Sequence, residues 1–292
     1  MPAIIKTENL SHIYSQGTIF EQAAIEDVSV EIEKGEYVGV IGHTGSGKST
    51  LIQHFNGLLR PTSGKIFIDG EDIWEKPKEI RKFRFKVGLV FQYPEYQLFE
   101  DTVYKDIAFG PTNMGYSPDE VDKLVREASA FVDLGPELLE KSPFEISGGQ
   151  RRRAAIAGVI AMNPDVLILD EPTAGLDPRG RDRIMGEIKE YHRQRKNTVL
   201  LVSHSMEDIA KHASKVMVLN QSKVFLYDRV EAVFSRAAQL EEMGLSVPQV
   251  TKICNRLSVA GVDISPETYT VEAAKEQVLA ALGKRERKAD GR

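Results

Sequence analysis

The sequence predicts an α/β protein with a parallel core sheet, an antiparallel β layer, a helical subdomain and a small C-terminal appendage. The parallel sheet is indicated by short continuous apolar runs, typical of strands buried on both faces, at 37–41, 87–91, 166–169 and 199–202. Stretches of helical character alternate with these runs, at about 48–58, 102–110, 117–134, 149–162, 179–195 and 206–213. Strands that alternate with helices favour a parallel arrangement.

The first 35 residues indicate the antiparallel layer, because Ile25, Val28, Val30 and Ile32 recur at near-even spacing, as in half-exposed strands. The helical subdomain is expected at about 100–160. Within it, Gly-Pro and Ser-Pro pairs between 110 and 143 separate helical stretches that contain no buried strand.

The C-terminal part differs in composition, with helical patterns at 247–260 and 271–282. We therefore expect one large α/β domain at 1–240 and an appendage at 241–283. Residues 284–292 are charged, contain no large apolar side chain and are predicted to form a mobile tail.

Composition limits the classes of function. The 292 residues are 41% hydrophobic and carry a net charge of −5, which disfavours a general affinity for nucleic acid. Cys254 is the single cysteine, and the opening residues lack the pattern of a signal peptide, so a cytosolic location is expected. The longest wholly apolar stretch apart from glycine, 154–162, is far shorter than a membrane span. A peripheral position on a membrane stays open.

A glycine-rich loop, Gly42-His-Thr-Gly-Ser-Gly-Lys48-Ser49, matches G-x-x-x-x-G-K-[ST] between a buried strand and a predicted helix. Backbone N–H groups around 45–50 can point at phosphates. Lys48 is expected to neutralise the β and γ phosphates of a nucleotide, and Ser49 to bind Mg²⁺ through its hydroxyl. We interpret the side chain of His43 as a surface or packing group, although the residue belongs to the loop. The nucleotide-binding residues predicted here are Gly42, His43, Thr44, Gly45, Ser46, Gly47, Lys48, Ser49 and Thr50.

Two carboxylates, Asp170 and Glu171, follow a buried strand at the edge where open α/β sheets bind ligands. Asp170 is expected to hold Mg²⁺, directly or through water. Glu171 is expected to orient or deprotonate the water that attacks the γ phosphate.

A second glycine-rich turn, Ser147-Gly148-Gly149-Gln150, also opens a predicted helix and could grip a phosphate. One ATP needs one such cradle, so the surplus suggests that this loop serves a nucleotide held by another subunit. The active unit would then be a head-to-tail dimer.

The order of these motifs, together with Gln92 after a buried strand, Ala174-Gly-Leu-Asp177 and His204, resembles the ATP-binding cassette (ABC) ATPases of membrane transporters, which are P-loop NTPases. The resemblance covers about residues 4–236. Ile146 stands where this family usually has leucine, an apolar exchange that should be tolerated.

The resemblance implies that ATP and Mg²⁺ are the cofactors. Glu171, His204 and Gln92 would be catalytic: Gln92 would sense Mg²⁺ and the attacking water, and His204 would hold the γ phosphate and Glu171 in register. The predicted metal-binding residues are Ser49, Gln92 and Asp170.

The resemblance also implies nucleotide contacts in a dimer. Tyr14 would stack on adenine, and Asp177 would couple the two sites. The residues implied to reach ATP bound by the opposite subunit are Ser147, Gly148, Gly149 and Gln150.

A narrower resemblance lies in residues 90–103 and 106–111, which look like the ATPases of energy-coupling factor importers of vitamins and transition-metal ions. The short C-terminal domain fits as well, since in that group it helps the ATPases to pair. Residues 152–158 and 171–177 resemble the second of two paralogous ATPases. The implied partners are a second ATPase subunit (paralogue or self), a transmembrane coupling subunit and a substrate-capturing membrane subunit, at the cytoplasmic face of the membrane.

The resemblance also implies that the membrane partner docks against residues 93–109 with short arginine-bearing helices, which the aromatic and acidic side chains of this segment could receive. The predicted apolar anchors are Tyr93, Tyr96, Leu98 and Phe99, and the predicted anionic partners are Glu95, Glu100 and Asp101.

Three other functions remain to be weighed. An ordinary ABC solute transporter ATPase would have a less similar 92–111 segment. A cassette protein acting on nucleic acid or ribosomes usually carries a long coiled coil or two cassettes, and neither is present in the sequence. A catalytically inactive scaffold is disfavoured because Lys48, Asp170, Glu171 and His204 are all present.

Overall fold

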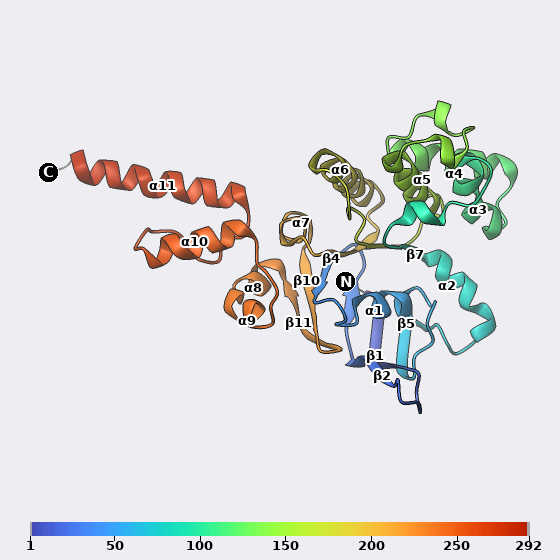
Figure 1. Ribbon diagram of the computed structural model, residues 1–292, viewed down its shortest axis with the longest axis horizontal. Helices are drawn as coiled ribbons and strands as arrows, with labels where there is room; N and C mark the ends of the chain where they lie inside the picture. Colours follow the sequence, from blue (N-terminus) through green and yellow to red (C-terminus); the bar gives the residue numbers. More distant parts are fainter. Residues whose placement is uncertain (1, 291–292) are drawn as a thin grey trace.

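The computed structural model describes the backbone of residues 2–290 and the side chains of residues 2–283. At its centre is a six-stranded sheet in the order β11-β10-β4-β9-β8-β7 (Figure 1). Neighbouring strands run parallel from β10 to β7, and β11 is antiparallel to β10. The strands are β4 (Tyr37–Gly42), β7 (Val87–Val90), β8 (Val166–Asp170), β9 (Thr198–Val202), β10 (Lys215–Asn220) and β11 (Lys223–Arg229).

The parallel strands are buried on both faces, which explains their continuous apolar sequences. In β8, Val166 and Ile168 belong to a core shared with the antiparallel layer, whereas Leu167 and Leu169 belong to a second core shared with helices. The carboxyl ends of β4, β8 and β9 meet at one edge of the sheet, where the predicted site residues follow.

The antiparallel layer has the order β2-β1-β5-β6, with β3 also paired to β1. It packs on the face of the parallel sheet that carries α1 (Lys48–Phe55). The sequence predicts this layer from its first 35 residues, but two of its five strands come from later in the chain. Its strands are β1 (Ala3–Tyr14), β2 (Gln22–Val28), β3 (Glu31–Glu33), β5 (Ser63–Ile68) and β6 (Glu71–Asp72), and α2 (Ile80–Lys86) follows.

A helical subdomain lies between β7 and β8 and stands apart from the sheet (Figure 1). Its helices have recognisable starting residues: Thr102 accepts a hydrogen bond from Lys105 N–H, and Ser117 and Ser147 each form a capping box. These helices are α3 (Val103–Met114), α4 (Pro118–Phe131) and α5 (Gly148–Ile160). The parallel sheet, antiparallel layer and helical subdomain predicted from the sequence are therefore confirmed.

Two helices follow the strands that carry the site. The first, α6 (Pro178–Arg195), comes after β8, and the second, α7 (Met206–His212), comes after β9. Both helices bury apolar side chains, among them Ile188 and Ile209, in the core that also contains Leu167 and Leu169 of β8.

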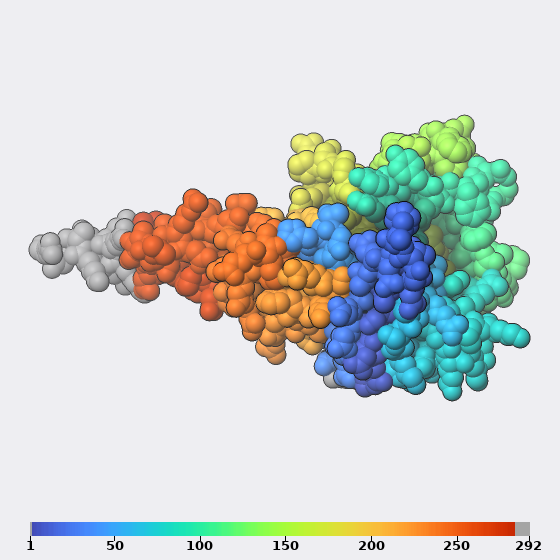
Figure 2. Space-filling view, turned by 60° about the horizontal axis from the view of Figure 1, so that its bottom comes forward, coloured from blue at the N-terminus to red at the C-terminus, as the bar shows by residue number. Residues whose placement is uncertain are grey.

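The C-terminal part protrudes from the cassette (Figures 1 and 2). Leu240, Leu245 and Val247 still belong to the cassette core, whereas Cys254 and Ala274 belong to a small separate core. The helices are α8 (Val230–Phe234), α9 (Ala237–Glu242), α10 (Gln249–Val259) and α11 (Val271–Asp290). The mobile tail at 284–292 stays a prediction, and residues 291–292 lie outside the described residues.

Among the described residues, no helix is long and apolar enough to cross a membrane.

Candidate functional site

A cavity of about 410 Å³ lies at the carboxyl edge of the parallel sheet. It brings together residues from the phosphate loop, the antiparallel layer and the ends of β7, β8 and β9. Its lining residues are Tyr14, Gln22, Ala24, Thr44, Gly45, Gly47, Lys48, Ser49, Thr50, Gln92, Asp170, Glu171, Val202 and His204.

The phosphate loop connects β4 to α1. Gly47 precedes α1 with φ of 100°, and a Cβ there would overlap the Ala24 carbonyl oxygen, so the turn requires glycine. Lys48 Nζ donates to the carbonyl oxygens of Gly42 (2.6 Å) and His43 (2.9 Å). Burial lowers the pKa of Lys48, and the nearby carboxylates oppose that shift.

Asp170 ends β8 and faces α1, where it accepts a hydrogen bond from Ser49 Oγ at 3.1 Å. Burial raises the pKa of Asp170, while the Ser49 hydrogen bond and the Lys48 charge lower it. Serine hydroxyl and carboxylate oxygens so close together suit one small hard cation.

Glu171 adopts a left-handed backbone with φ of 50°, which is unusual for a residue other than glycine and turns the chain away from the sheet. Its side chain is 14% exposed and lies 3.7 Å from His204 Nε2. Burial raises the pKa of Glu171 to about 7. Its buried Oε1 atom has no hydrogen-bond partner within the described chain, so this oxygen is available to a molecule in the cavity.

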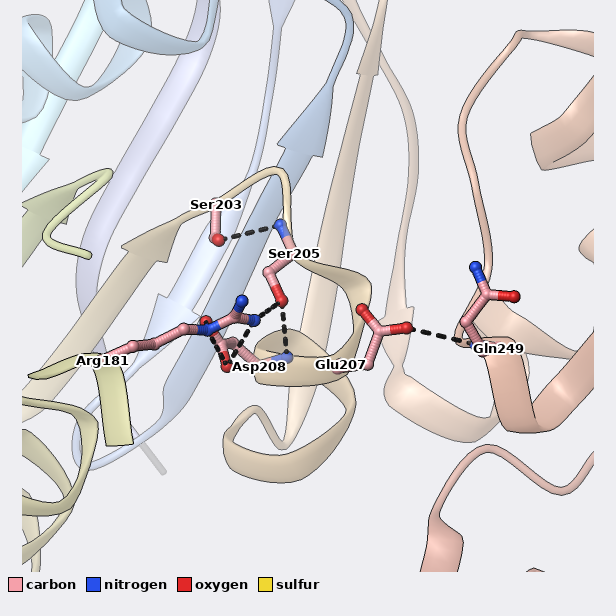
Figure 3. A network of polar contacts seen from close by, with 6 residues as sticks. All are labelled: Arg181, Ser203, Ser205, Glu207, Asp208 and Gln249. Atoms are coloured by element: carbon pink, nitrogen blue, oxygen red, sulfur yellow. Dashed lines mark hydrogen bonds and ion pairs between the residues drawn. The ribbon is translucent and has the colours of Figure 1, made fainter. Parts of the chain in front are cut away.

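His204 sits between two serines that are fixed by a polar network (Figure 3). Ser203 Oγ accepts from Ser205 N–H at 3.0 Å, and Ser205 Oγ accepts from Asp208 N–H at 3.2 Å and also from Arg181. Arg181 of α6 donates twice to Asp208, at 2.9 and 3.1 Å. The network therefore joins the helix after Asp177 to the segment that presents His204.

Gln92 lines the cavity, and the chain after it is anchored to the helical subdomain. Arg152 of α5 donates to both carboxylate oxygens of Glu95, at 2.6 and 2.9 Å, and to the carbonyl oxygens of Pro172 and Ala174. Burial opposes ionisation of Glu95, but the Arg152 contacts outweigh it and hold its pKa below the ordinary value.

The expectation that Glu95 serves as an anionic partner for a membrane subunit is therefore wrong. Its carboxylate is 14% exposed and already occupied by a buried arginine of the same chain. Asp101, by contrast, is 85% exposed and forms only a surface ion pair with Lys105.

Tyr14 closes the cavity on the side of the antiparallel layer. Its ring is half-exposed and contacts His12 edge to face at 4.5 Å between centroids, and His12 in turn contacts buried His54 of α1. The Tyr14 hydroxyl lies 3.3 Å from Thr50 Oγ1. Tyr14 therefore lines the cavity with a ring exposed enough to stack on a planar ligand group.

The second glycine-rich turn does not reach this cavity. Ser147 caps α5 by accepting from Gln150 N–H at 3.3 Å, and Gln150 accepts from Ser147 N–H at 2.8 Å. A Cβ on Gly149 would meet nothing within 4 Å. Asp177 is also outside the cavity and caps α6 through Gly180 N–H at 2.6 Å.

Some predicted loop residues do not line the cavity. Gly42 and Ser46 support the loop from behind, and His43 turns its imidazole toward Met243 of the C-terminal segment. Sequence reasoning also missed Gln22, which pairs with Tyr14 across the β1–β2 hairpin, and Ala24 beside it. The register of that hairpin is the only signal that could have indicated them.

The geometry has counterparts in known proteins. A family model described as ABC transporter matches residues 25–174. The energy-coupling factor transporter ATP-binding protein EcfA2 of Caldanaerobacter subterraneus subsp. tengcongensis is 55% identical over 278 residues, covering 95% of this chain and 97% of that protein. The protein of the same name from Clostridium tetani is 56% identical over 276 residues, covering 94% and 96%.

Solved structures of ATP-binding cassettes are similar to this chain as well. The structure of cbiO1 from Clostridium perfringens, part of the ABC transporter complex cbiONQ, has a TM-score of 0.73 and 37% identity, and covers 87% of this chain and 98% of that one. The dimeric, ADP- and Pi-bound ATP-binding cassette MJ0796 has a TM-score of 0.70 and 28% identity, covering 77% and 98%. The resemblance drawn from the motifs, including the second-paralogue assignment, is confirmed. This chain belongs to the ABC transporter family, among the ATP-binding subunits of energy-coupling factor transporters.

Proposed function

We propose that this chain hydrolyses ATP as one half of an ATPase pair that powers an energy-coupling factor importer of vitamins or transition-metal ions. The membership of the chain in this family supports the transport role. The observation that carries the chemistry is a single cavity lined by Lys48, Ser49, Asp170, Glu171 and His204.

The residues present fit ATP with Mg²⁺. Ser49 Oγ and Asp170 Oδ2 lie 3.1 Å apart and can both bind one cation, and Gln92 offers an amide oxygen in the same cavity. Mg²⁺ bound there would neutralise charge on the β and γ phosphates. Lys48 would exchange its bonds to loop carbonyls for phosphate oxygens, and Tyr14 would stack on adenine.

Glu171 is the base of the proposed hydrolysis. Its unpartnered Oε1 accepts a hydrogen bond from a water, takes its proton, and leaves the water oxygen to attack the γ phosphorus while the bond to the β-phosphate oxygen breaks. A pKa near 7 lets this carboxylate take a proton at neutral pH. His204, whose Nε2 lies 3.7 Å from Glu171 Oε1, would hold the γ phosphate and Glu171 in register.

The turn at 147–150 supplies the other half of the site to a second subunit. It is presented at the N-terminus of α5 away from its own cavity, an arrangement that suits ATP bound by the facing subunit. The similarity to a dimeric cassette supports this pairing. The second subunit is a paralogue or another copy of this chain. Exposed apolar side chains on the appendage, Ile253, Val259, Leu279 and Leu282, would add a contact that needs no nucleotide.

The membrane partner would dock on the helical subdomain. A groove of about 550 Å³ between α3 and α4 carries Tyr104, Phe109, Tyr116 and the carboxylate of Glu100. Tyr96 and Phe99, 82% and 64% exposed, are further apolar anchors near Gln92. Docking of arginine-bearing helices of a transmembrane coupling subunit on this surface would hold the chain peripherally at the cytoplasmic membrane face.

Charge reversal tests this proposal. Glu100→Lys with Asp101→Lys should lower copurification with the membrane subunit about tenfold while ATP affinity of the isolated chain stays unchanged. The matched control, Asp133→Lys with Glu137→Lys, reverses two exposed carboxylates of the same subdomain that do not line the groove. Normal copurification and uptake with the reversed groove would place the docking site elsewhere. Ribosomes or DNA as the copurifying partner would overturn the transport function.

A further inference from the structure

The chain returns to the phosphate loop at the start of the C-terminal part. His43 Nε2 donates to the carbonyl oxygen of Met243, two hundred positions later. A carbonyl oxygen can only accept, so Nε2 carries the hydrogen. Gly244 lies against the same imidazole: a Cβ there would lie 2.9 Å from Nε2 and 3.0 Å from Cε1.

The same histidine is part of the phosphate loop through its backbone. The His43 carbonyl oxygen accepts from Lys48 Nζ at 2.9 Å and from Ser46 N–H at 3.1 Å. The residue whose imidazole contacts Met243 thus also carries a backbone carbonyl that fixes the conformation of the phosphate loop.

The C-terminal segment is fixed in place on its other side. Leu245 and Val247 are buried in the cassette core, and this burial restricts the movement of the turn at 243–244. Two residues later, Gln249 N–H donates to Glu207 Oε1 at 3.2 Å (Figure 3). Glu207 belongs to α7, which follows His204. Residues 243–249 thus contact both the phosphate loop and the helix behind His204.

We propose that His43 is a positioning residue that fastens the phosphate loop to the turn at 243–244, so that the C-terminal part sets the ATP affinity of its own subunit. The proposal rests on the proposed ATP site. The His43 imidazole does not line the cavity, and it acts on the nucleotide through the backbone of the loop, in which the His43 carbonyl oxygen accepts from Ser46 N–H. The appendage would then affect ATP binding by its own chain and would also contact a second subunit.

The test uses two glycines with the same backbone requirement. Gly244 and Gly261 have φ of 68° and 81°, but a Cβ on Gly261 meets nothing within 4 Å. Gly244→Ala and Gly261→Ala therefore carry similar backbone strain, and only Gly244→Ala pushes on His43. Equilibrium binding of a fluorescent ATP analogue to the full-length chain is the primary readout, with KM and kcat for ATP as the second.

Gly244→Ala should raise the ATP Kd about fivefold or more relative to Gly261→Ala, with KM rising more than kcat falls. His43→Ala should have a similar effect, and His43→Gln, whose amide nitrogen can still donate to the Met243 carbonyl, should restore most of the affinity. In the His43→Ala background, Gly244→Ala should cost no more than Gly261→Ala does, because the steric contact is gone.

Equal effects of Gly244→Ala and Gly261→Ala, or additive effects of His43→Ala and Gly244→Ala, would overturn the proposal while leaving the ATP site intact. Failure of the unsubstituted chain to bind the ATP analogue would instead overturn the proposed function. Thermal unfolding of each variant shows whether lost affinity reflects lost folding. His43→Gln keeps the proposal testable if His43→Ala does not fold.

Discussion

The two glycine-rich turns of this chain both open helices, yet they are placed in opposite ways. The phosphate loop before α1 faces Asp170, Glu171 and His204 across one cavity. The turn before α5 is capped by Ser147 and Gln150 within itself and faces no carboxylate or imidazole of the cavity. The difference supports the proposal that the first turn binds the nucleotide of its own chain, whereas the second acts on a nucleotide that a second chain brings to it.

The largest expected effect lies in the cavity that contains the phosphate loop. Glu171→Gln keeps the size of the side chain but removes the base, so turnover should fall on the order of 10²-fold or more while ATP binding survives. Glu187→Gln is the matched control, because burial also raises the pKa of Glu187 to about 7 but its carboxylate lies outside the cavity. Steady-state hydrolysis should stay within a few-fold for the control. Comparable turnover in both variants would remove Glu171 from the mechanism.

A smaller effect is expected from the turn before α5. A Cβ on Gly149 meets no atom within 4 Å in the free chain, so Gly149→Asp should leave folding and ATP binding by the isolated subunit unchanged. In the assembled pair the added carboxylate would face the γ phosphate, and hydrolysis should fall about tenfold or more. The control, Gly186→Asp, also fills open space on a helix, α6. Reduced ATP binding by the isolated Gly149→Asp chain would mean that the turn serves its own nucleotide.

How much of this arrangement the sequence predicts depends on how local its signals are. The phosphate loop, the Asp170-Glu171 pair and four of the five buried parallel strands were predicted, because each is a continuous apolar run or a short motif. The fifth, β10, was missed although its residues 216–219 form an equally continuous buried apolar run. The strands β5 and β11 were missed since they are largely exposed and carry charged residues, which weakens the apolar pattern.

Non-local contacts account for the rest. Glu95 looked like a free surface carboxylate, but Arg152, 57 positions later, occupies it. His43 looked like a surface or packing group, and no local pattern indicates that its ring meets the chain again at Met243. Hydrogen bonds between residues so far apart depend on the folded backbone, which the sequence pattern alone does not give.

The smallest effect concerns pH. Burial raises the pKa of Glu171 from 4.5 to about 7, so between these values the folded nucleotide-free protein holds a proton that the unfolded chain has released. The contribution of Glu171 to the free energy of unfolding is therefore fully present below pH 4.5, falls as the pH rises toward 7, and is constant above. Gln cannot ionise, so the stability of Glu171→Gln relative to the unsubstituted protein should increase from pH 5 to pH 8 in urea unfolding.

The turn before α5 sharpens this test, since Ser147, Gly148, Gly149 and Gln150 carry no group that titrates in this range. Ser147→Ala removes a helix cap, so it should lower stability by about 1 kcal/mol, equally at pH 5 and pH 8. A stability difference for Glu171→Gln that is likewise constant with pH would mean that this carboxylate ionises at its ordinary pKa in the folded chain. Its role as a base poised near neutral pH would then have to come from the second subunit, which would make even the phosphate-loop half of the site incomplete on its own.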